Sequence, residues 1–91
     1  MVIERFTPET ARDIYRRVRE GSRLLPDGLR YVDSWVWADL RGCFQVMECD
    51  DLALLQEWIA RWGDLAELEV LPVVSSSTTQ ELMARLDSEP G

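Results

Sequence analysis

The sequence contains no histidine, no lysine and no asparagine. Without histidine there is no imidazole to serve as a general base near neutral pH or to bind a metal ion. Without lysine, Schiff-base chemistry and the phosphate-binding lysine of a Walker motif are excluded. We therefore expect no metal site and no cofactor. Any catalysis would depend on Asp, Glu, Cys, Tyr, Arg or bound water.

Positive charge is also scarce, because 10 arginines stand against 17 acidic residues and the net charge is −7. Neutralising phosphates requires surplus positive charge, so this balance argues against nucleic-acid binding. No apolar run approaches the length of about 20 residues that crosses a bilayer. Glu4 and Arg5 also interrupt the stretch that would be apolar in a signal peptide. We expect a cytoplasmic protein with no membrane partner.

Cysteine is limited to Cys43 and Cys49, which lie on one predicted strand. An extended strand separates them by about 20 Å, too far for a disulfide. We expect two buried free thiols. The 91 residues, of which 46% are hydrophobic, suffice for one small domain.

Two helices are indicated by apolar stripes with i, i+3, i+4, i+7 spacing. The first begins at Thr7-Pro8, can end at Gly21, and has the stripe Ala11, Ile14, Tyr15 and Val18. The second follows an Asp50 or Asp51 cap, ends at Gly63, and has the stripe Leu55, Trp58, Ile59 and Trp62.

Strands are predicted over residues 2–6, 29–38, 43–49 and 67–74, with a hairpin loop at 39–42. Pro72 marks the fourth strand as an edge strand. After a loop at 75–79, a short third helix spans 80–86. The fold class is therefore α+β: a ferredoxin-like βαββαβ domain with a four-stranded antiparallel sheet over 1–76, and a C-terminal helix and frayed tail over 77–91. The first and third strands are central.

A left-handed Gly42 in the hairpin would pair Val36 with Val46 and Trp37 with Gln45. One sheet face is then mostly aliphatic, as expected under two helices: Val32, Ser34, Val36, Phe44 and Val46. The other face carries Tyr31, Asp33, Trp35, Trp37, Gln45 and Met47. Two helices cannot cover both faces, and a bare aromatic face is unusual on a monomer. We expect a homodimer with the two sheets packed face to face.

Such a dimer can leave a cavity between its sheets. We expect Glu4 to face this cavity and Arg5 to point away, because Arg5 lies nearer the strand end and can reach water. Buried carboxyl groups must be paired or protonated, so Glu4 and Asp33 are candidates for shifted pKa values. The predicted ligand-pocket residues are Glu4, Tyr31, Asp33, Trp35, Trp37, Gln45 and Met47.

The stretches VIERFTP and GLRYVDSWVWADLRGCFQVMECDDLALLQEWIARWGDLAELEVLPVV resemble a small bacterial family known only as a domain of unknown function, number 3303. The resemblance covers nearly the whole chain, roughly residues 1 to 76. It implies a dimeric α+β barrel and brings no catalytic residues with it.

Two classes of function remain open. One is a small apolar or aromatic ligand in the dimer cavity, between walls of Tyr31, Trp35 and Trp37; the alternative is that these side chains are only dimer core. Dimeric α+β barrels include cofactor-free monooxygenases and isomerases, but this is analogy at the level of fold. The second class is a non-catalytic interaction or regulatory domain acting through the arginines at 12, 16, 17, 19 and 23. The sequence favours binding over catalysis.

Overall fold

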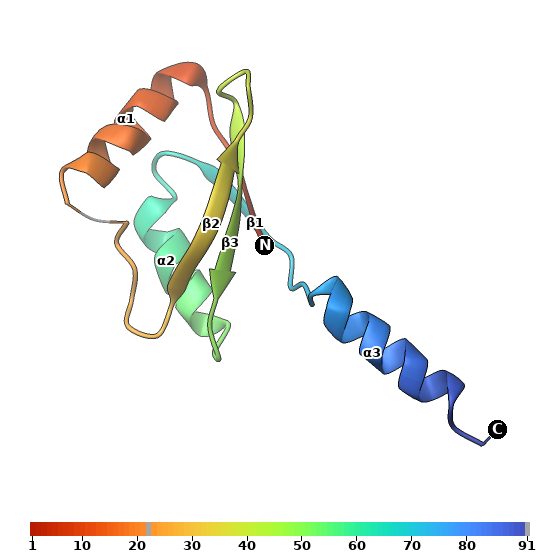
Figure 1. The fold of residues 1–91 in the computed structure, drawn as a ribbon. Helices are drawn as coiled ribbons and strands as arrows, with labels where there is room; N and C mark the ends of the chain where they lie inside the picture. Colours follow the sequence, from red (N-terminus) through yellow and green to blue (C-terminus); the bar gives the residue numbers. More distant parts are fainter. Residues whose placement is uncertain (22, 91) are drawn as a thin grey trace.

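The computed structural model describes residues 1–21 and 23–90 (Figure 1). The element order is β1 (Val2–Arg5), α1 (Pro8–Arg19), β2 (Arg30–Val36), β3 (Gly42–Glu48), α2 (Ala53–Trp62), β4 (Glu67–Val70) and α3 (Ser76–Asp87). The strands form one antiparallel sheet in the order β2-β3-β1-β4. The predicted α+β class, the ferredoxin-like order and the central positions of the first and third strands are confirmed.

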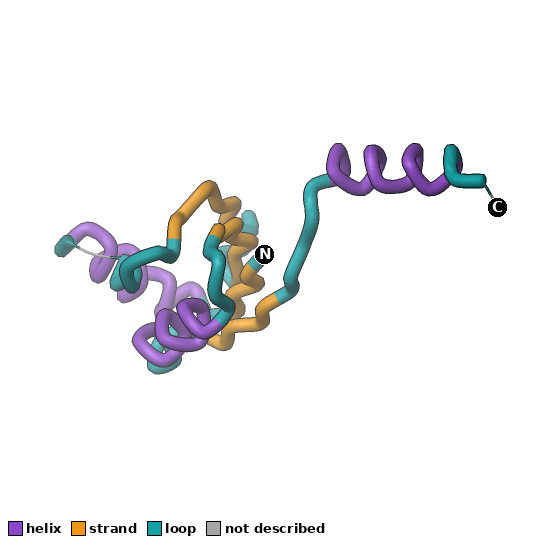
Figure 2. The backbone as a smooth tube through the Cα atoms, turned by 90° about the horizontal axis from the view of Figure 1, so that it is seen from below, coloured by secondary structure: helices purple, strands orange, loops and turns teal. Residues whose placement is uncertain are grey.

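Both domain helices lie on one side of this sheet, as Figure 2 shows. The hydrophobic core forms between them and the sheet, where the buried members are Val2, Ile14, Leu29, Leu55, Trp58 and Trp62. The opposite face has no helix of the domain over it, and α3 stands away from it (Figures 1 and 2). This face is called the open face below.

The start of α1 follows the predicted capping chemistry. The Thr7 hydroxyl accepts a hydrogen bond from the backbone N–H of Thr10 at 3.1 Å, and Pro8 occupies the first helical turn. At α2 the Asp51 carboxylate accepts from the N–H of Ala53 at 2.9 Å, although Leu52 holds the cap position. Ile14 of the first stripe and Leu55, Trp58 and Trp62 of the second are buried in the core, so both apolar stripes turn toward the sheet as their spacing predicted.

The predicted hairpin register is wrong. Val36 lies opposite Cys43, and the left-handed backbone position belongs to Leu40, with φ 60°, rather than to Gly42. Gly42 serves close packing instead, because a Cβ there would lie 2.6 Å from the Trp37 ring. The resulting shift of three residues is odd, so the side chains of β3 exchange faces relative to the prediction.

This exchange corrects several predicted positions. Phe44 and Val46 lie on the open face, whereas Gln45 and Met47 lie under the helices. A bulge between Tyr31 and Asp33 moves Tyr31 from the predicted open face to the helix side, and leaves Val32 exposed. The open face does carry Asp33, Trp35 and Trp37, the last packed on Phe44, and the helix side carries Ser34 and Val36, as predicted.

The side chain of Glu4 also lies on the face opposite to the predicted one. It points under the helices, next to Cys43 and Leu68, and not toward the open face. Arg5 takes the open face, where it pairs with Glu69 at 3.3 Å. The long Arg5 stem can reach water from a sheet face, whereas Glu4 is enclosed.

The end of the chain differs from prediction as well. The fourth strand stops at Val70, before Leu71-Pro72, because proline cannot donate to the ladder. Residues 76–79 of the predicted loop are helical, since Ser75 caps α3 by accepting from the N–H of Thr78 at 3.3 Å. In the part of the chain described, no helix has the length and apolarity that crossing a bilayer requires. Gly91, at the end of the predicted tail, lies outside the described residues.

Candidate functional site

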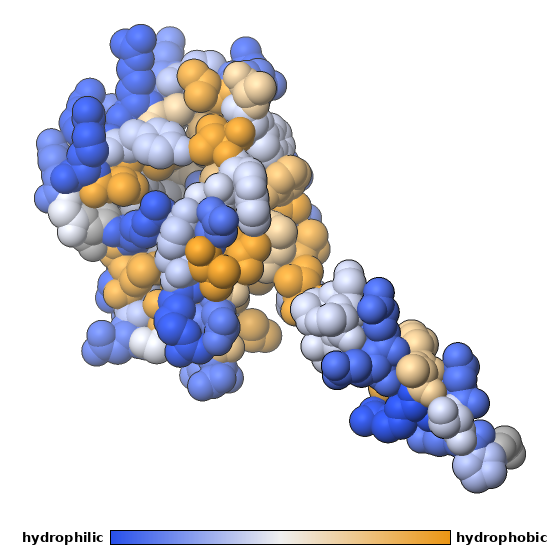
Figure 3. Space-filling model, in the orientation of Figure 1, coloured by the Kyte–Doolittle hydropathy of each residue, from blue (hydrophilic) through white to orange (hydrophobic). Residues whose placement is uncertain are grey.

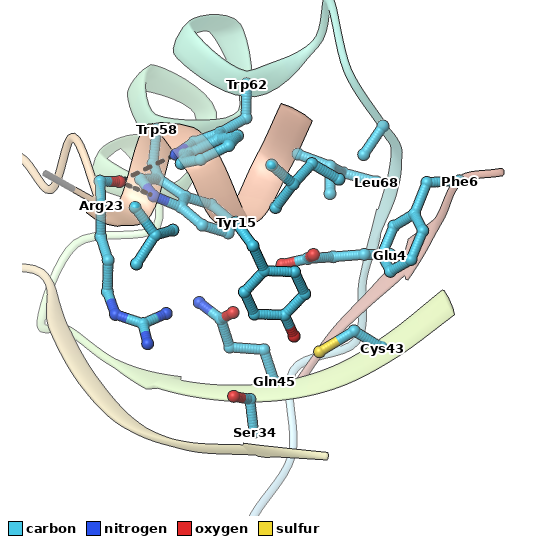
Figure 4. A pocket seen from close by; sticks show the side chains of 13 residues that line it. Glu4, Phe6, Tyr15, Arg23, Ser34, Cys43, Gln45, Trp58, Trp62 and Leu68 are labelled. Carbon is cyan, nitrogen blue, oxygen red and sulfur yellow. Dashed lines mark hydrogen bonds between the residues drawn. The ribbon is translucent and has the colours of Figure 1, made fainter. Parts of the chain in front are cut away.

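A cavity of about 50 Å³ lies between the sheet and the two domain helices (Figure 4). Its apolar wall consists of Phe6, Ile14, Val18, Trp58, Trp62, Ala66 and Leu68. Its polar lining consists of Glu4, Tyr15, Arg23, Ser34, Cys43 and Gln45. Six polar side chains converging on one enclosed space are unusual for a domain this small, since buried polar groups are costly unless they are satisfied.

Glu4 is the central ionisable group of the cavity. Its side chain comes from the central strand β1, and the residue is 8% exposed. Burial raises the Glu4 pKa from its usual 4.5 to about 7, and the nearby Arg23 cation opposes that rise. Among the described residues, none donates a hydrogen bond to the Glu4 carboxyl group. Glu4 is therefore close to half-ionised at neutral pH, with its hydrogen-bonding capacity free.

Two further acidic groups lie near Glu4: the phenol of Tyr15 on α1, and the thiol of Cys43, which is the partner of Glu4 across the β1–β3 pair. Burial raises the pKa of the Tyr15 phenol, and the neighbouring Cys43 and Glu4 add to the rise. Burial, reinforced by Glu4, raises the pKa of the Cys43 thiol to about 11. Figure 4 shows the Tyr15 hydroxyl directed toward Cys43. Both groups therefore stay protonated at neutral pH, and Cys43 is not a thiolate nucleophile.

The sheet side of the cavity is fixed by hydrogen bonds along β2 and β3. Gln45, which is 4% exposed, donates from its amide nitrogen to the Met47 sulfur at 2.8 Å. The Ser34 and Tyr31 hydroxyls lie 2.6 Å apart. Because these contacts hold the side chains in place, the amide oxygen of Gln45 and the Ser34 hydroxyl present fixed polar groups to the cavity.

Arg23 closes the cavity from the connection between α1 and β2. Its backbone carbonyl accepts hydrogen bonds from the indole N–H groups of both Trp58, at 2.9 Å, and Trp62, at 2.8 Å. Its guanidinium carbon lies 3.8 Å from the centroid of the Tyr31 ring, a cation–π contact. The next residue, Leu24, has a left-handed φ of 57° and accepts at its carbonyl from Arg61 at 2.9 Å.

Arg17 braces the far ends of the two helices that cover the cavity. It donates two hydrogen bonds to Asp64, at 3.1 and 2.8 Å, and its guanidinium carbon lies 5.1 Å from the centroid of the Trp62 ring. The hydrogen bonds from Arg17 hold the pKa of Asp64 below its usual value. The contact keeps Trp62 oriented toward Arg23.

The structure brings together only part of the predicted pocket. Glu4 and Gln45 line the cavity. Tyr31 and Met47 lie behind the lining, where Tyr31 is hydrogen-bonded to Ser34 and Met47 to Gln45. Asp33, Trp35 and Trp37 lie on the open face, away from this cavity.

Sequence reasoning missed Tyr15, Arg23, Ser34 and Cys43 as lining residues. Tyr15 and the two tryptophans were recognised as members of helix stripes, which is the signal a core-facing residue gives. The sequence shows Arg23 only as a member of an arginine cluster and gives no sign that its backbone carbonyl binds two indole groups. No three His, Cys, Asp or Glu side chains of the described residues are grouped to hold a metal ion.

The fold and cavity together define a small ferredoxin-like α+β domain with a part-polar internal pocket. The chain belongs to the family described as Domain of unknown function (DUF3303), whose model matches residues 1–87. Comparison with curated proteins and with solved structures found no match.

Proposed function

We propose that this domain binds a small aromatic molecule bearing a hydroxyl or carboxyl group, in the pocket between the sheet and the helices, and that Glu4 shares a proton with it. The proposed pocket lies within one chain, whereas the cavity expected from the sequence lies between the sheets of two chains. The aromatic and aliphatic walls would enclose the ring, and the polar side chains would orient its substituent.

The observation that carries this proposal is the Glu4 carboxyl group, which lines the cavity and has no hydrogen-bond donor among the described residues. Its oxygens are therefore available to a partner from outside the chain. When ionised it accepts from a ligand hydroxyl. When protonated it donates to a ligand carboxylate, and the Arg23 cation favours an anionic substituent.

Cavity size limits how such a ligand enters. A volume of about 50 Å³ holds only a few waters, well below the range of about 300 Å³ and more typical of ligand pockets. A ring therefore requires the segment around Arg23 and Leu24 to move outward. Three side chains hold that segment through its carbonyls: Trp58, Trp62 and Arg61. We assign this segment the role of a gate.

Proton exchange follows from the environment of Glu4. General acid–base catalysis works best when the pKa of the group lies near the operating pH. Burial raises the pKa of Glu4 to about 7, so that near neutral pH this one carboxyl group can both accept and donate a proton. Proton transfer within a bound ligand is the reaction this arrangement could support.

The test is to titrate the protein with phenol and with benzoate while following the indole N–H signals of Trp58 and Trp62 by NMR. We expect both probes to shift these signals and to raise the melting temperature, because a ligand that binds only the folded form stabilises it. Benzoate affinity should fall as pH rises through 7, since an ionised Glu4 repels a carboxylate.

Two variants make the test specific. Glu4→Gln keeps the shape but cannot ionise, so benzoate affinity should lose its dependence on pH. Glu67→Gln is the matched control, because it makes the same change at an exposed position of β4 and should behave like the wild type. If neither probe moves the two indole signals, the cavity holds only water and the proposal fails.

A further inference from the structure

The open face of the sheet is apolar at its centre. Trp35 is 55% exposed and Phe44 is 42% exposed, and they are partners across β2 and β3. Ile3 and Val46 lie on the same face. Figure 3 shows apolar surface on the side of the domain that is turned toward α3. Contiguous apolar area of this kind marks an interaction site rather than ordinary surface.

The helix α3 has no support from its own domain. Every described residue from Leu71 onward is exposed, and among described residues no hydrogen bond or ion pair ties α3 to the sheet or to the other helices. It nevertheless carries an apolar stripe of Leu82, Met83 and Leu86. Isolated helices shorter than about 12 to 15 residues are marginal in water, so a 12-residue helix needs a surface to pack on.

We propose that a second copy of this chain covers both surfaces. The two open faces pack together across a two-fold axis, and α3 of each copy crosses to lie on the partner. The interface is thus made by one sheet face and one exchanged helix from each subunit.

The course of the chain after β4 supports exchange over folding back. Pro72 and the extended segment Leu71–Ser75 carry α3 away from its own sheet, on the open-face side (Figures 1 and 2). A partner packed on the open face would occupy that same side. In the geometry observed, α3 therefore projects toward the side where a second copy would pack, and it would lie against that copy.

The area of the sheet also favours a role for α3 in the dimer interface. Four strands about 4.8 Å apart and about five residues long at about 3.3 Å per residue present roughly 300 Å² in projection. A stable interface buries about 800 Å² on each partner. The sheet face is thus small, and α3 enlarges the contact by a rod about 18 Å long and about 10 Å wide.

The charged groups on the open face suit a self-association. Arg5 pairs with Glu69 and Arg30 with Glu48, while the Asp33 carboxylate accepts from the N–H of Ser34 at 2.7 Å. Charges already paired within one chain cost less to cover than isolated ones. A second copy can therefore approach without leaving these groups unpaired.

A groove beside α1 offers α3 a place on the partner. It has a volume of about 530 Å³ and is lined by Pro8, Ala11, Arg12, Tyr15, Arg16, Val18, Arg19 and Leu40. Its apolar floor matches the α3 stripe, and its arginines can meet Asp87 on one border of that stripe, whereas Arg85 lies on the other border. Three arginines of the sequence cluster, Arg12, Arg16 and Arg19, thereby lie where α3 of the partner would pack.

Symmetry brings this groove to α3. Arg5 faces both Gly42 and Glu67, so β4 starts at the hairpin end of the sheet and ends at the opposite end, where α3 departs. A two-fold axis between the sheets and perpendicular to the strands reverses the strand direction of the partner. The partner's hairpin, with Leu40, and the start of its α1 then lie beside α3.

Sedimentation equilibrium of the full chain tests the exchange. We expect a dimer, and the double substitution Leu82→Glu with Leu86→Glu should raise the dissociation constant at least tenfold, because it places charge in a buried apolar contact. Ala84→Glu is the matched control: it adds a charge to the opposite side of α3 and should leave the dimer intact. Circular dichroism checks that each variant is folded.

A mixing experiment separates exchange from other contacts. Leu40→Glu disrupts the groove, and Leu82→Glu with Leu86→Glu disrupts the apolar stripe of α3. A homodimer of either variant therefore has no intact contact between α3 and the groove. A mixed dimer regains one such contact, and mixing the two weakened variants should restore dimer. A wild type that is monomeric at about 100 μM, a dimer insensitive to the α3 substitutions, or a mixture that stays monomeric would each overturn the proposal.

Discussion

The indole ring of Trp37 lies directly across Gly42, so that a Cβ at position 42 would stand 2.6 Å from the ring and 2.7 Å from the backbone oxygen of Glu4. The same ring packs against Phe44 at a centroid distance of 5.5 Å. One glycine thus joins the end of the hairpin, the open face and the strand that carries the pocket carboxyl group.

Substitution of this glycine should be costly. Gly42→Ala forces either the Trp37 ring or β1 to move, and overpacking of this kind destabilises by about 1 to 3 kcal/mol. Chemical denaturation measures the loss. Gly63→Ala is the control, because Gly63 has a helical φ of −63° and its nearest contact would be 3.3 Å. Equal stability of Gly42→Ala and wild type would contradict the observed packing.

The hairpin shows where sequence reasoning stops. The helices could be predicted because both of their signals are local. The apolar spacing of α1 and α2 repeats within a few residues, and the side chains of Thr7 and Asp51 accept hydrogen bonds from nearby backbone groups. The sequence predicts a left-handed Gly42, whereas the structure requires a glycine there for lack of space and places Leu40 in the left-handed region. Both uses of glycine look identical in a sequence, and the wrong one reverses the faces of β3.

The pocket was predictable only in part for a related reason. Glu4 and Gln45 are polar residues in an apolar strand context, and that mismatch is visible in the sequence. The gate is not visible, because its key group is the carbonyl of Arg23, shared by two tryptophans that come from α2. Backbone acceptors carry no residue signature, so only the folded chain reveals them.

The stability of the protein should fall as pH rises through the range set by Glu4. Its pKa is raised from 4.5 to about 7 in the folded chain, so the folded state binds more protons than the unfolded state between these values. The contribution of Glu4 to the free energy of unfolding, on the order of 3 kcal/mol, is fully present below about pH 4.5 and is lost by about pH 7.

Denaturation at pH 5 and pH 8 measures this loss. Glu4→Gln should flatten the difference between the two pH values and should be more stable than the wild type at pH 8, because it buries no charge. Glu67→Gln should keep the wild-type difference. A Glu4→Gln profile parallel to the wild type would mean that Glu4 does not titrate in this range.

The two thiols should differ sharply in reactivity. The Cys43 pKa is raised to about 11 by burial, whereas Cys49 is only half-buried. At pH 8 the fraction of Cys43 present as thiolate is then about a hundredth of that of an ordinary thiol. Iodoacetamide should modify Cys49 first, as mass spectrometry of digested protein reports. Rapid labelling of Cys43 in the folded chain would contradict its burial.

The gate should respond cooperatively to loss of its two indole donors. Trp58→Phe or Trp62→Phe alone leaves the Arg23 carbonyl with one hydrogen bond, and each should cost about 1 kcal/mol for the bond lost, besides any packing change. The double variant leaves that carbonyl without a donor from α2. An unsatisfied buried acceptor costs about 1 to 3 kcal/mol, so the double loss should exceed the sum of the singles.

A double-mutant cycle by chemical denaturation gives this coupling directly. Hydrogen exchange supplies a second measurement, because amides around Leu24 and Leu25 should exchange faster in the double variant than in either single one. Simple additivity would show that the carbonyl finds another donor, such as water, once the first indole is gone. In that case the segment around Arg23 would already open easily. The two tryptophans would then act only as walls of the pocket, and their hydrogen bonds would not hold the segment closed.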